Sequence, residues 1–193
     1  MMDLPAVEPG EWLVGLSSVV IQDGNYDDFE VGQRRRFALE FYEADLAVAP
    51  DAEPSASAVG DGRYDVTARV GFAARGLAVL DFGLLAYRDT IPPAVEPGAT
   101  VRCRVFLEVD KFSYFERHAK REGVPPAVYS WTITGIWRRP ASFPAITSYA
   151  AGVPAAPPGY EWLGRTRAWE DDDGRADYVL RCRLEADAPS RSL

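Results

Sequence analysis

In two segments of the chain, Leu77–Tyr87 and Thr100–Val109, every second residue is apolar. This period is typical of β-strands that bury one face. The predicted buried faces are Ala78, Leu80, Phe82, Leu84 and Ala86 on the first segment and Val101, Cys103, Val105, Leu107 and Val109 on the second. The proline-rich connection, Arg88–Ala99, suits a long loop. Pairing the segments symmetrically as a hairpin places Phe82 opposite Val105, because a slip of one residue would turn one buried face outward.

Further strands and one short helix are predicted around this hairpin. The strands lie at Arg63–Val70, Ala127–Arg138 and Tyr178–Glu185, and the helix at Ser113–Arg121. Three strands, a helix, a strand and a closing strand follow the element order of an OB-fold barrel. We therefore expect an all-β protein with one short helix, folded as an OB-like antiparallel β-barrel or sandwich.

The rest of the 193 residues is expected to join this core in a single domain, 1–193. Strands at Trp12–Ile21 and Arg35–Tyr42 predict an additional N-terminal hairpin within residues 11–43. The OB-like core comprises residues 58–138 and 160–186, and includes a strand at Tyr160–Trp169. The remaining segments are predicted as a mobile loop at 44–62, a proline-rich loop at 139–159 and a frayed tail from Ala186.

The chain carries a net charge of −8 and has a sequence pI of about 4.7. Because nucleic-acid binders need a basic field, these values argue against a nucleic-acid partner. The N-terminal residues lack the pattern of a secretory signal, and no apolar run reaches the ~20 residues of a membrane helix. We therefore expect a cytoplasmic protein without a membrane partner, in which Cys103 and Cys182 are buried free thiols. Abundant Arg, with Lys111 and Lys120 as the only lysines, is typical of a GC-rich bacterial genome.

Most sequence motifs of catalysis are missing. The single histidine, His118, excludes a histidine-rich metal site. The chain contains no Cys-x-x-Cys pair, no nucleotide-binding glycine loop and no Gly-x-Ser-x-Gly elbow. His118 lies near the C-terminal end of the predicted helix, where a positive charge is favourable, so we expect it to be exposed. These features favour a protein that is not an enzyme.

One acidic segment, Asp23–Glu30, begins like a metal-binding loop. The candidate ligands are Asp23, Asn25, Asp27 and Asp28, of which the first three have the spacing that opens a calcium loop. The pattern then departs from such a loop, because no glycine occupies position six and no glutamate position twelve. An ordinary acidic turn explains the same residues. The alternatives are a site for Ca²⁺ or another divalent metal and a metal-assisted hydrolase that also uses Glu30; no other cofactor is expected.

A second candidate site lies on the outer face of the predicted hairpin. This face carries Tyr87, Arg102, Arg104 and Phe106. OB-type barrels bind oligonucleotides or sugars there, and Arg beside exposed rings suits a small anionic or sugar ligand. Alternatively, the N-terminal hairpin or a second subunit covers the face, and Asp81 pairs with Arg104. We expect the covered arrangement, because Phe106 with Val79 and Leu85 is too apolar to face water.

These patterns together favour a non-enzymatic binding or interaction module over a hydrolase. The surplus strands, whose apolar faces need partners, also predict a homodimer or another protein partner, because exposed strand edges invite pairing.

Overall fold

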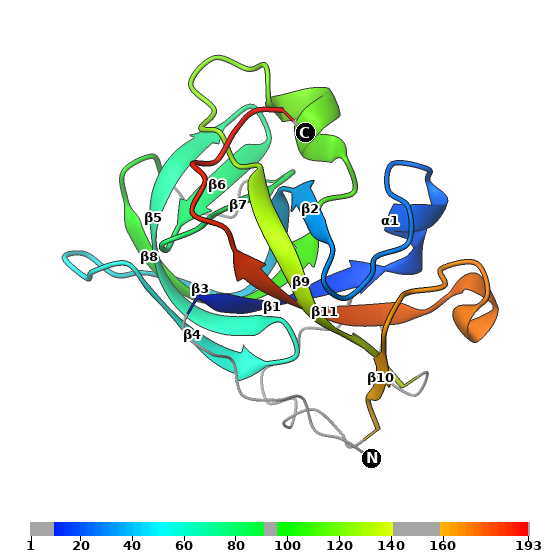
Figure 1. Ribbon diagram of the computed structural model, residues 1–193. Coiled ribbons are helices and arrows are strands. Elements are labelled where there is room, and N and C mark those ends of the chain that lie inside the picture. Colours follow the sequence, from blue (N-terminus) through cyan, green and yellow to red (C-terminus); the bar gives the residue numbers. More distant parts are fainter. Residues whose placement is uncertain (1–9, 91–95, 141–158, 193) are drawn as a thin grey trace.

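The computed structural model describes residues 10–90, 96–140 and 159–192 (Figure 1). The structure is mostly β, with 52% strand and 9% helix, and five strands close into a barrel. The predicted all-β class is therefore confirmed. Three of the segments that the OB-like prediction placed in the barrel, Arg63–Val70, Leu77–Tyr87 and Thr100–Val109, do lie in it, whereas two others, Ala127–Arg138 and Tyr178–Glu185, do not.

The barrel consists of β3 (Leu39–Val48), β5 (Arg63–Ala74), β6 (Leu77–Asp81), β7 (Leu85–Arg88) and β8 (Thr100–Val109). β8 pairs with β3 and β5, β5 with β6, and β6 with β7, and a parallel pairing of β7 with β3 completes the circle. A further strand, β4 (Ser55–Gly60), pairs with the first half of β5. All ten residues of the two predicted buried faces are buried, so the period-two pattern identified them correctly.

The predicted hairpin between Leu77–Tyr87 and Thr100–Val109 does not form. The first segment is itself a hairpin, in which β6 and β7 pair with Asp81 opposite Leu85. Asp81 Oδ1 accepts a hydrogen bond from the Gly83 N–H (3.1 Å), and Gly83 has a φ of +97°, a conformation that favours glycine. These two residues therefore turn the chain, and Val105 on β8 lies opposite Tyr64 of β5 rather than opposite Phe82.

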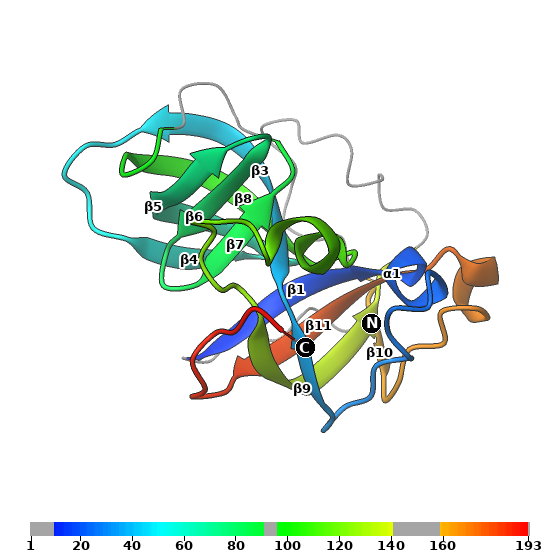
Figure 2. The same cartoon turned by 90° about the horizontal axis from the view of Figure 1, so that it is seen from above.

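Beside the barrel, the same hydrogen-bonded sheet continues through β1 (Glu11–Ser17) into a second group of strands, which we call the second sheet (Figure 2). It contains β1, β11 (Asp177–Leu184) and β9 (Tyr129–Arg138), and both β2 (Arg34–Phe37) and β10 (Glu161–Leu163) also pair with β9. β9 and β11 are the predicted strands Ala127–Arg138 and Tyr178–Glu185. They are present, but they lie in this sheet instead of closing the barrel.

The predicted N-terminal hairpin is replaced by pairings with distant parts of the chain. β1 ends at Ser17, whose side chain caps helix α1 (Ser18–Gln22) by accepting a hydrogen bond from the Val19 N–H (3.4 Å). β1 pairs with β11 and, at Gly15, with β8. The predicted strand Arg35–Tyr42 divides at Ala38 into β2, in the second sheet, and β3, in the barrel. Residues 11–43 therefore connect the two sheets.

Phe106 of β8 fills the junction between the barrel and the second sheet. A Cβ at Gly15 of β1 would lie within 3.0 Å of two ring carbons of Phe106, and a Cβ at Gly62 would lie 2.9 Å from a third. The guanidinium of buried Arg139 lies 5.0 Å from the ring centroid and donates a hydrogen bond from Nε to Asp61 Oδ1 (3.0 Å). Glycine at two positions thus lets the backbone pack directly on this ring.

Several segments differ from their predicted loop or strand structure. Residues 44–62 contain the end of β3 and all of β4, and the predicted strand Tyr160–Trp169 is reduced to β10. The C-terminal tail is held to the body of the protein. Ser190 pairs with Val128, and Arg191 Nη1 donates a hydrogen bond to the Ala119 carbonyl (2.8 Å). Most of the predicted loop 139–159 lies outside the described residues.

The predicted helix is present as a single π-helical turn, Tyr114–His118. A 3₁₀ turn, Asp171–Gly174, also occurs. His118 is only 3% exposed, and its Nε2 contacts Asp89 Oδ1, so the prediction that it is exposed was wrong. Its ring packs 5.7 Å from that of Tyr87 on β7, because the helix covers the outside of the barrel at this point. In the described ranges, no helix has both the length and the apolar character needed to cross a bilayer.

Candidate functional site

The four residues of the predicted hairpin face do not share one surface. Tyr87 is 0% exposed and packs against the π-helix, and Phe106 is 1% exposed at the sheet junction. Arg102 and Arg104 are exposed, and Arg104 forms a bidentate ion pair with Asp65 (2.7 and 3.0 Å). The covered arrangement is therefore the one observed, with the cover supplied by the chain itself. The predicted ion pair between Asp81 and Arg104 was wrong.

The two exposed arginines border a pocket of about 480 Å³ on the barrel wall. The other lining residues are Asp45, Ser55, Asp65, Val66, Thr67 and Cys103. Two aspartates balance the two arginines, so the pocket has no net attraction for an anion. Burial raises the pKa of the Cys103 thiol to about 12, which keeps it protonated and unreactive at neutral pH.

The four candidate metal ligands of the acidic segment do not converge on a metal site. Asp28 is committed elsewhere, because its Oδ1 accepts hydrogen bonds from Thr166 Oγ1 (2.9 Å) and the Ala168 N–H (3.0 Å). Its Oδ2 lies 3.6 Å from Arg165 Nη2. Across the described ranges, no three His, Cys, Asp or Glu side chains are grouped closely enough to hold a metal ion. The segment instead forms one wall of a cleft.

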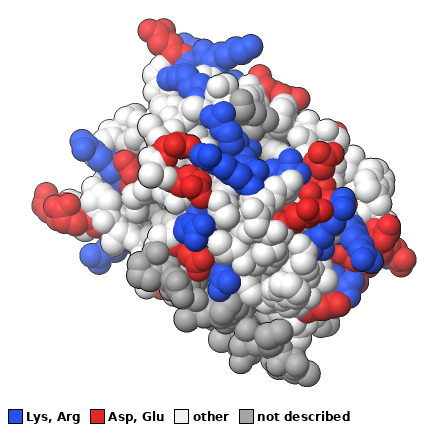
Figure 3. Space-filling view, in the orientation of Figure 1, with Lys and Arg blue, Asp and Glu red and all other residues white. Residues whose placement is uncertain are grey.

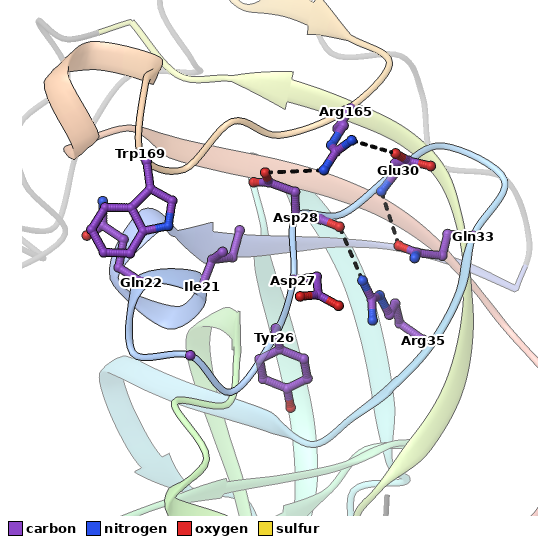
Figure 4. Close-up of a pocket in the computed structure, with 11 residues that line it drawn as sticks. Ile21, Gln22, Tyr26, Asp27, Asp28, Glu30, Gln33, Arg35, Arg165 and Trp169 are labelled. Carbon is purple, nitrogen blue, oxygen red and sulfur yellow. Dashed lines mark hydrogen bonds and ion pairs between the residues drawn. The ribbon is translucent and has the colours of Figure 1, made fainter.

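This cleft has a volume of about 480 Å³, within the range of roughly 300–1,000 Å³ that is typical of ligand pockets (Figure 4). One wall is the acidic segment with the end of α1 and the start of β2. The other is the segment after β10, residues 164–170, which we call the Trp169 loop. The lining residues are Ile21, Gln22, Gly24, Tyr26, Asp27, Asp28, Glu30, Gln33, Arg35, Arg165 and Trp169.

Backbone and side-chain contacts hold the two walls together. The Phe29 N–H donates a hydrogen bond to Thr166 Oγ1 (2.9 Å), and the Thr166 N–H donates one to the Phe29 carbonyl (2.9 Å). Figure 4 shows Arg165 between Asp28 and Glu30, and its Nη1 lies 3.2 Å from Glu30 Oε1. These contacts fix the two walls of the cleft relative to each other.

The far end of the Trp169 loop is fixed as well. Gln22 Nε2 donates hydrogen bonds to the carbonyls of Ala168 and Gly174, both at 2.7 Å. Asp171 Oδ2 accepts hydrogen bonds from the Arg167 N–H (3.2 Å) and the Tyr178 hydroxyl (3.0 Å). These contacts hold the backbone on both sides of Trp169 next to the end of α1.

Other polar groups of the cleft remain available. The Asp27 carboxylate forms no hydrogen bond or ion pair with the described part of the chain, and Gln33 uses only its Oε1, which accepts from the Glu30 N–H (3.2 Å). Arg35 lies 5.5 Å from the centroid of the Phe29 ring, and its Nη2 donates to the Asp28 carbonyl (3.2 Å). Trp169 is 70% exposed.

A buried polar cluster lies outside this cleft. The Tyr87 hydroxyl donates a hydrogen bond to Asp110 Oδ1, which also accepts one from the Tyr114 N–H (3.3 Å). Burial raises the pKa of Asp110 to about 7. His118, whose ring also packs near Tyr87, contacts Asp89, and neither His118 nor Asp89 lines the cleft. Neither of the two pockets described above is lined by a residue of this cluster, so neither gives a substrate access to it.

Charge is spread over the surface. On the face shown in Figure 3, a group of basic side chains gathers in the upper centre, and acidic side chains lie around it. The net charge of −8 argues against a polyanionic partner.

The sequence pointed to one wall of the cleft and missed the other. The acidic segment was conspicuous, but Arg165 and Trp169 carry no motif, and Thr166 is 138 residues away from Asp28. Asp171 lies in an acidic run, Asp171–Asp173, and nothing in the sequence indicates that it shapes the Trp169 loop.

Comparison of the chain with protein-family models, curated proteins and solved structures gives no match.

Proposed function

We propose that this protein is a cytosolic, non-enzymatic binding module whose small-molecule ligand occupies the cleft between the acidic segment and the Trp169 loop. The observation that carries the proposal is the combination of fixed walls with uncommitted polar groups. Walls that are ordered before binding reduce the entropy that the complex must lose. The uncommitted groups supply the few placed polar contacts that orient a ligand.

The roles of the cleft carboxylates support binding rather than hydrolysis. Asp28 and Glu30 hold Arg165, and Asp28 also holds the backbone of the Trp169 loop. Asp27 is therefore the one lining carboxylate without a partner among the described residues. Glycoside hydrolysis by carboxylates uses a positioned pair. The single histidine, which is the usual alternative proton carrier, is buried beside Asp89.

Nuclear magnetic resonance with a library of small-molecule fragments tests this function. We expect bound fragments to shift the amide resonances of Asp27 and of Arg165–Trp169. Asp28→Ala should abolish these shifts, because it removes the contacts that hold the Trp169 loop. Asp23→Ala removes the same charge from a residue that does not line the cleft and should leave them intact. Shifts that cluster on another surface, or none in the cleft, would contradict the proposal.

A homodimer remains a prediction, and the structure changes the surface that would form it. The apolar strip around Phe106 is covered within the chain, whereas β4 contains no charged residue and pairs on one side only within the described sheet. Since open edges invite pairing, we expect light scattering to report a dimer and Ser57→Lys on β4 to yield monomers. A monomeric mass for the wild-type protein would contradict this prediction.

A further inference from the structure

The indole of Trp169 provides a flat apolar surface at the cleft. The residue is 70% exposed, and Figure 4 shows the ring beside Ile21 and Gln22, on the opposite side of the cleft from Arg35. The backbone on both sides of it is held by Gln22 and Asp171. An exposed aromatic ring at a cleft favours a ligand that has a flat or apolar face of its own.

The polar part of the cleft consists of planar groups. The Asp27 carboxylate, the Gln33 amide and the Arg35 guanidinium each hold their polar atoms in one plane. Both oxygens of Asp27 are free of partners among the described residues, whereas Gln33 Oε1 and Arg35 Nη2 already bond within the chain. Asp27 offers acceptors, whereas Gln33 Nε2 and Arg35 offer donors. A hydroxyl group both donates and accepts, so a ligand with adjacent hydroxyls satisfies all three side chains.

The charges of the lining disfavour a charged ligand. Asp27, Asp28 and Glu30 outnumber Arg35 and Arg165, so an anion meets a net negative charge. Asp28 and Glu30 share the single positive charge of Arg165, so the excess over the whole lining is one negative charge, and Asp27 is the lining carboxylate that no described cation contacts. Proteins that capture organic cations surround them with several aromatic rings, and Trp169 is one exposed ring.

We infer that the cleft binds a neutral saccharide, an assignment of ligand class that rests on the binding function proposed above. One face of a sugar ring stacks on Trp169, and the hydroxyls on its edge bond to Asp27 and Gln33. The volume of about 480 Å³ and the exposed rim leave room for a second sugar unit to extend outward.

A panel of immobilised neutral mono- and oligosaccharides, followed by calorimetric titration of the free sugars, tests the inference. We expect at least one member to bind wild-type protein and Trp169→Ala to weaken that binding by about tenfold or more. Trp162→Ala is the matched control. Trp162 is 52% exposed on β10 but does not line the cleft, so its replacement should leave the Kd unchanged. Thermal melts establish that both variants are folded.

Asp27→Asn distinguishes a saccharide from a cation. Asparagine keeps an acceptor oxygen and removes the charge, so saccharide binding should weaken by less than about tenfold. Asp23→Asn makes the same change outside the cleft and should have no effect. Binding of small organic amines from a parallel panel, lost in Asp27→Asn, would overturn the inference in favour of a cationic ligand.

The remaining outcomes separate the ligand class from the binding function. If no saccharide binds while fragments still shift the cleft resonances, the ligand class is wrong and the binding module stands. If neither library affects the cleft, both are wrong. Saccharide binding that Trp169→Ala leaves intact would also overturn the inference, because the ring would then take no part.

Discussion

Phe106→Ala is expected to lower the free energy of unfolding by about 3–5 kcal/mol. The ring is 1% exposed and lies between Gly15 and Gly62, with the Arg139 guanidinium 5.0 Å from its centroid. Removing it leaves a cavity that backbone on two sides cannot fill, and it removes the ring next to a buried cation. The loss should appear as a lower midpoint in urea unfolding followed by tryptophan fluorescence.

A second pair of variants tests whether the glycine and the ring are coupled. Gly15→Ala alone should destabilise the protein, because its Cβ would fall within 3.0 Å of two Phe106 ring carbons. Phe106→Leu makes room for that methyl group, so the double variant should be more stable than the sum of the two losses predicts, by about 0.5–3 kcal/mol. Gly164→Ala is the control, since a Cβ there meets nothing within 4 Å. A cost below about 1 kcal/mol for Phe106→Ala would contradict the packing described.

This junction shows what alternation in a sequence predicts and what it does not. The period-two pattern identified the inner faces of both segments, and the apolar outer residues Val79 and Phe106 indicated that the outer face is covered. The pattern did not identify the cover. β1 lies some ninety residues before β8 in the sequence. It packs on Phe106 because Gly15 has no side chain, and a single glycine adds nothing to a period-two pattern.

The strand pairing failed for a local reason. Phe82 and Leu84 continue the alternation through Gly83, so Leu77–Tyr87 resembled one long strand. The Asp81–Gly83 hydrogen bond turns the chain there, and turn chemistry prevailed over periodicity. The cleft was likewise only partly predictable. Its acidic wall could be recognised from the local composition, whereas the contacts of Asp28 with Thr166 and Ala168 depend on the tertiary structure.

The free energy of unfolding is expected to fall as the pH rises from 5 to 8. Glu108 and Asp110, at the end of β8, are 3% and 0% exposed. Burial raises the pKa of each carboxyl to about 7, and the negative charge of Glu40 adds to both shifts. Lys111, whose Nζ lies 3.9 Å from Glu108 Oε2, opposes the shift of Glu108 without cancelling it.

The sign follows from proton binding. The ordinary pKa values of these carboxyls are 4.5 for Glu108 and 3.8 for Asp110, so between those values and about 7 the folded chain binds more protons than the unfolded chain. The stabilisation is therefore fully present below the ordinary pKa values and is lost as the pH rises through about 7. Since one pKa unit corresponds to about 1.4 kcal/mol, each carboxyl contributes on the order of 3 to 4 kcal/mol over its full titration.

Urea unfolding of wild type and variants at pH 5, 6, 7 and 8 measures this dependence. Glu108→Gln and Asp110→Asn keep the shape of the side chains but do not titrate, so each variant should be more stable than wild type at pH 8 and show a flatter pH dependence. Asp65→Asn is the control. The hydrogen bond from Arg104 lowers the pKa of that exposed carboxyl, so its stabilisation is lost only as the pH falls below about 4 and the slope above pH 5 should not change. A wild-type stability that is constant or rises from pH 5 to 8, or a Glu108→Gln variant with the wild-type slope, would show that these carboxyls are ionised in the folded protein without cost.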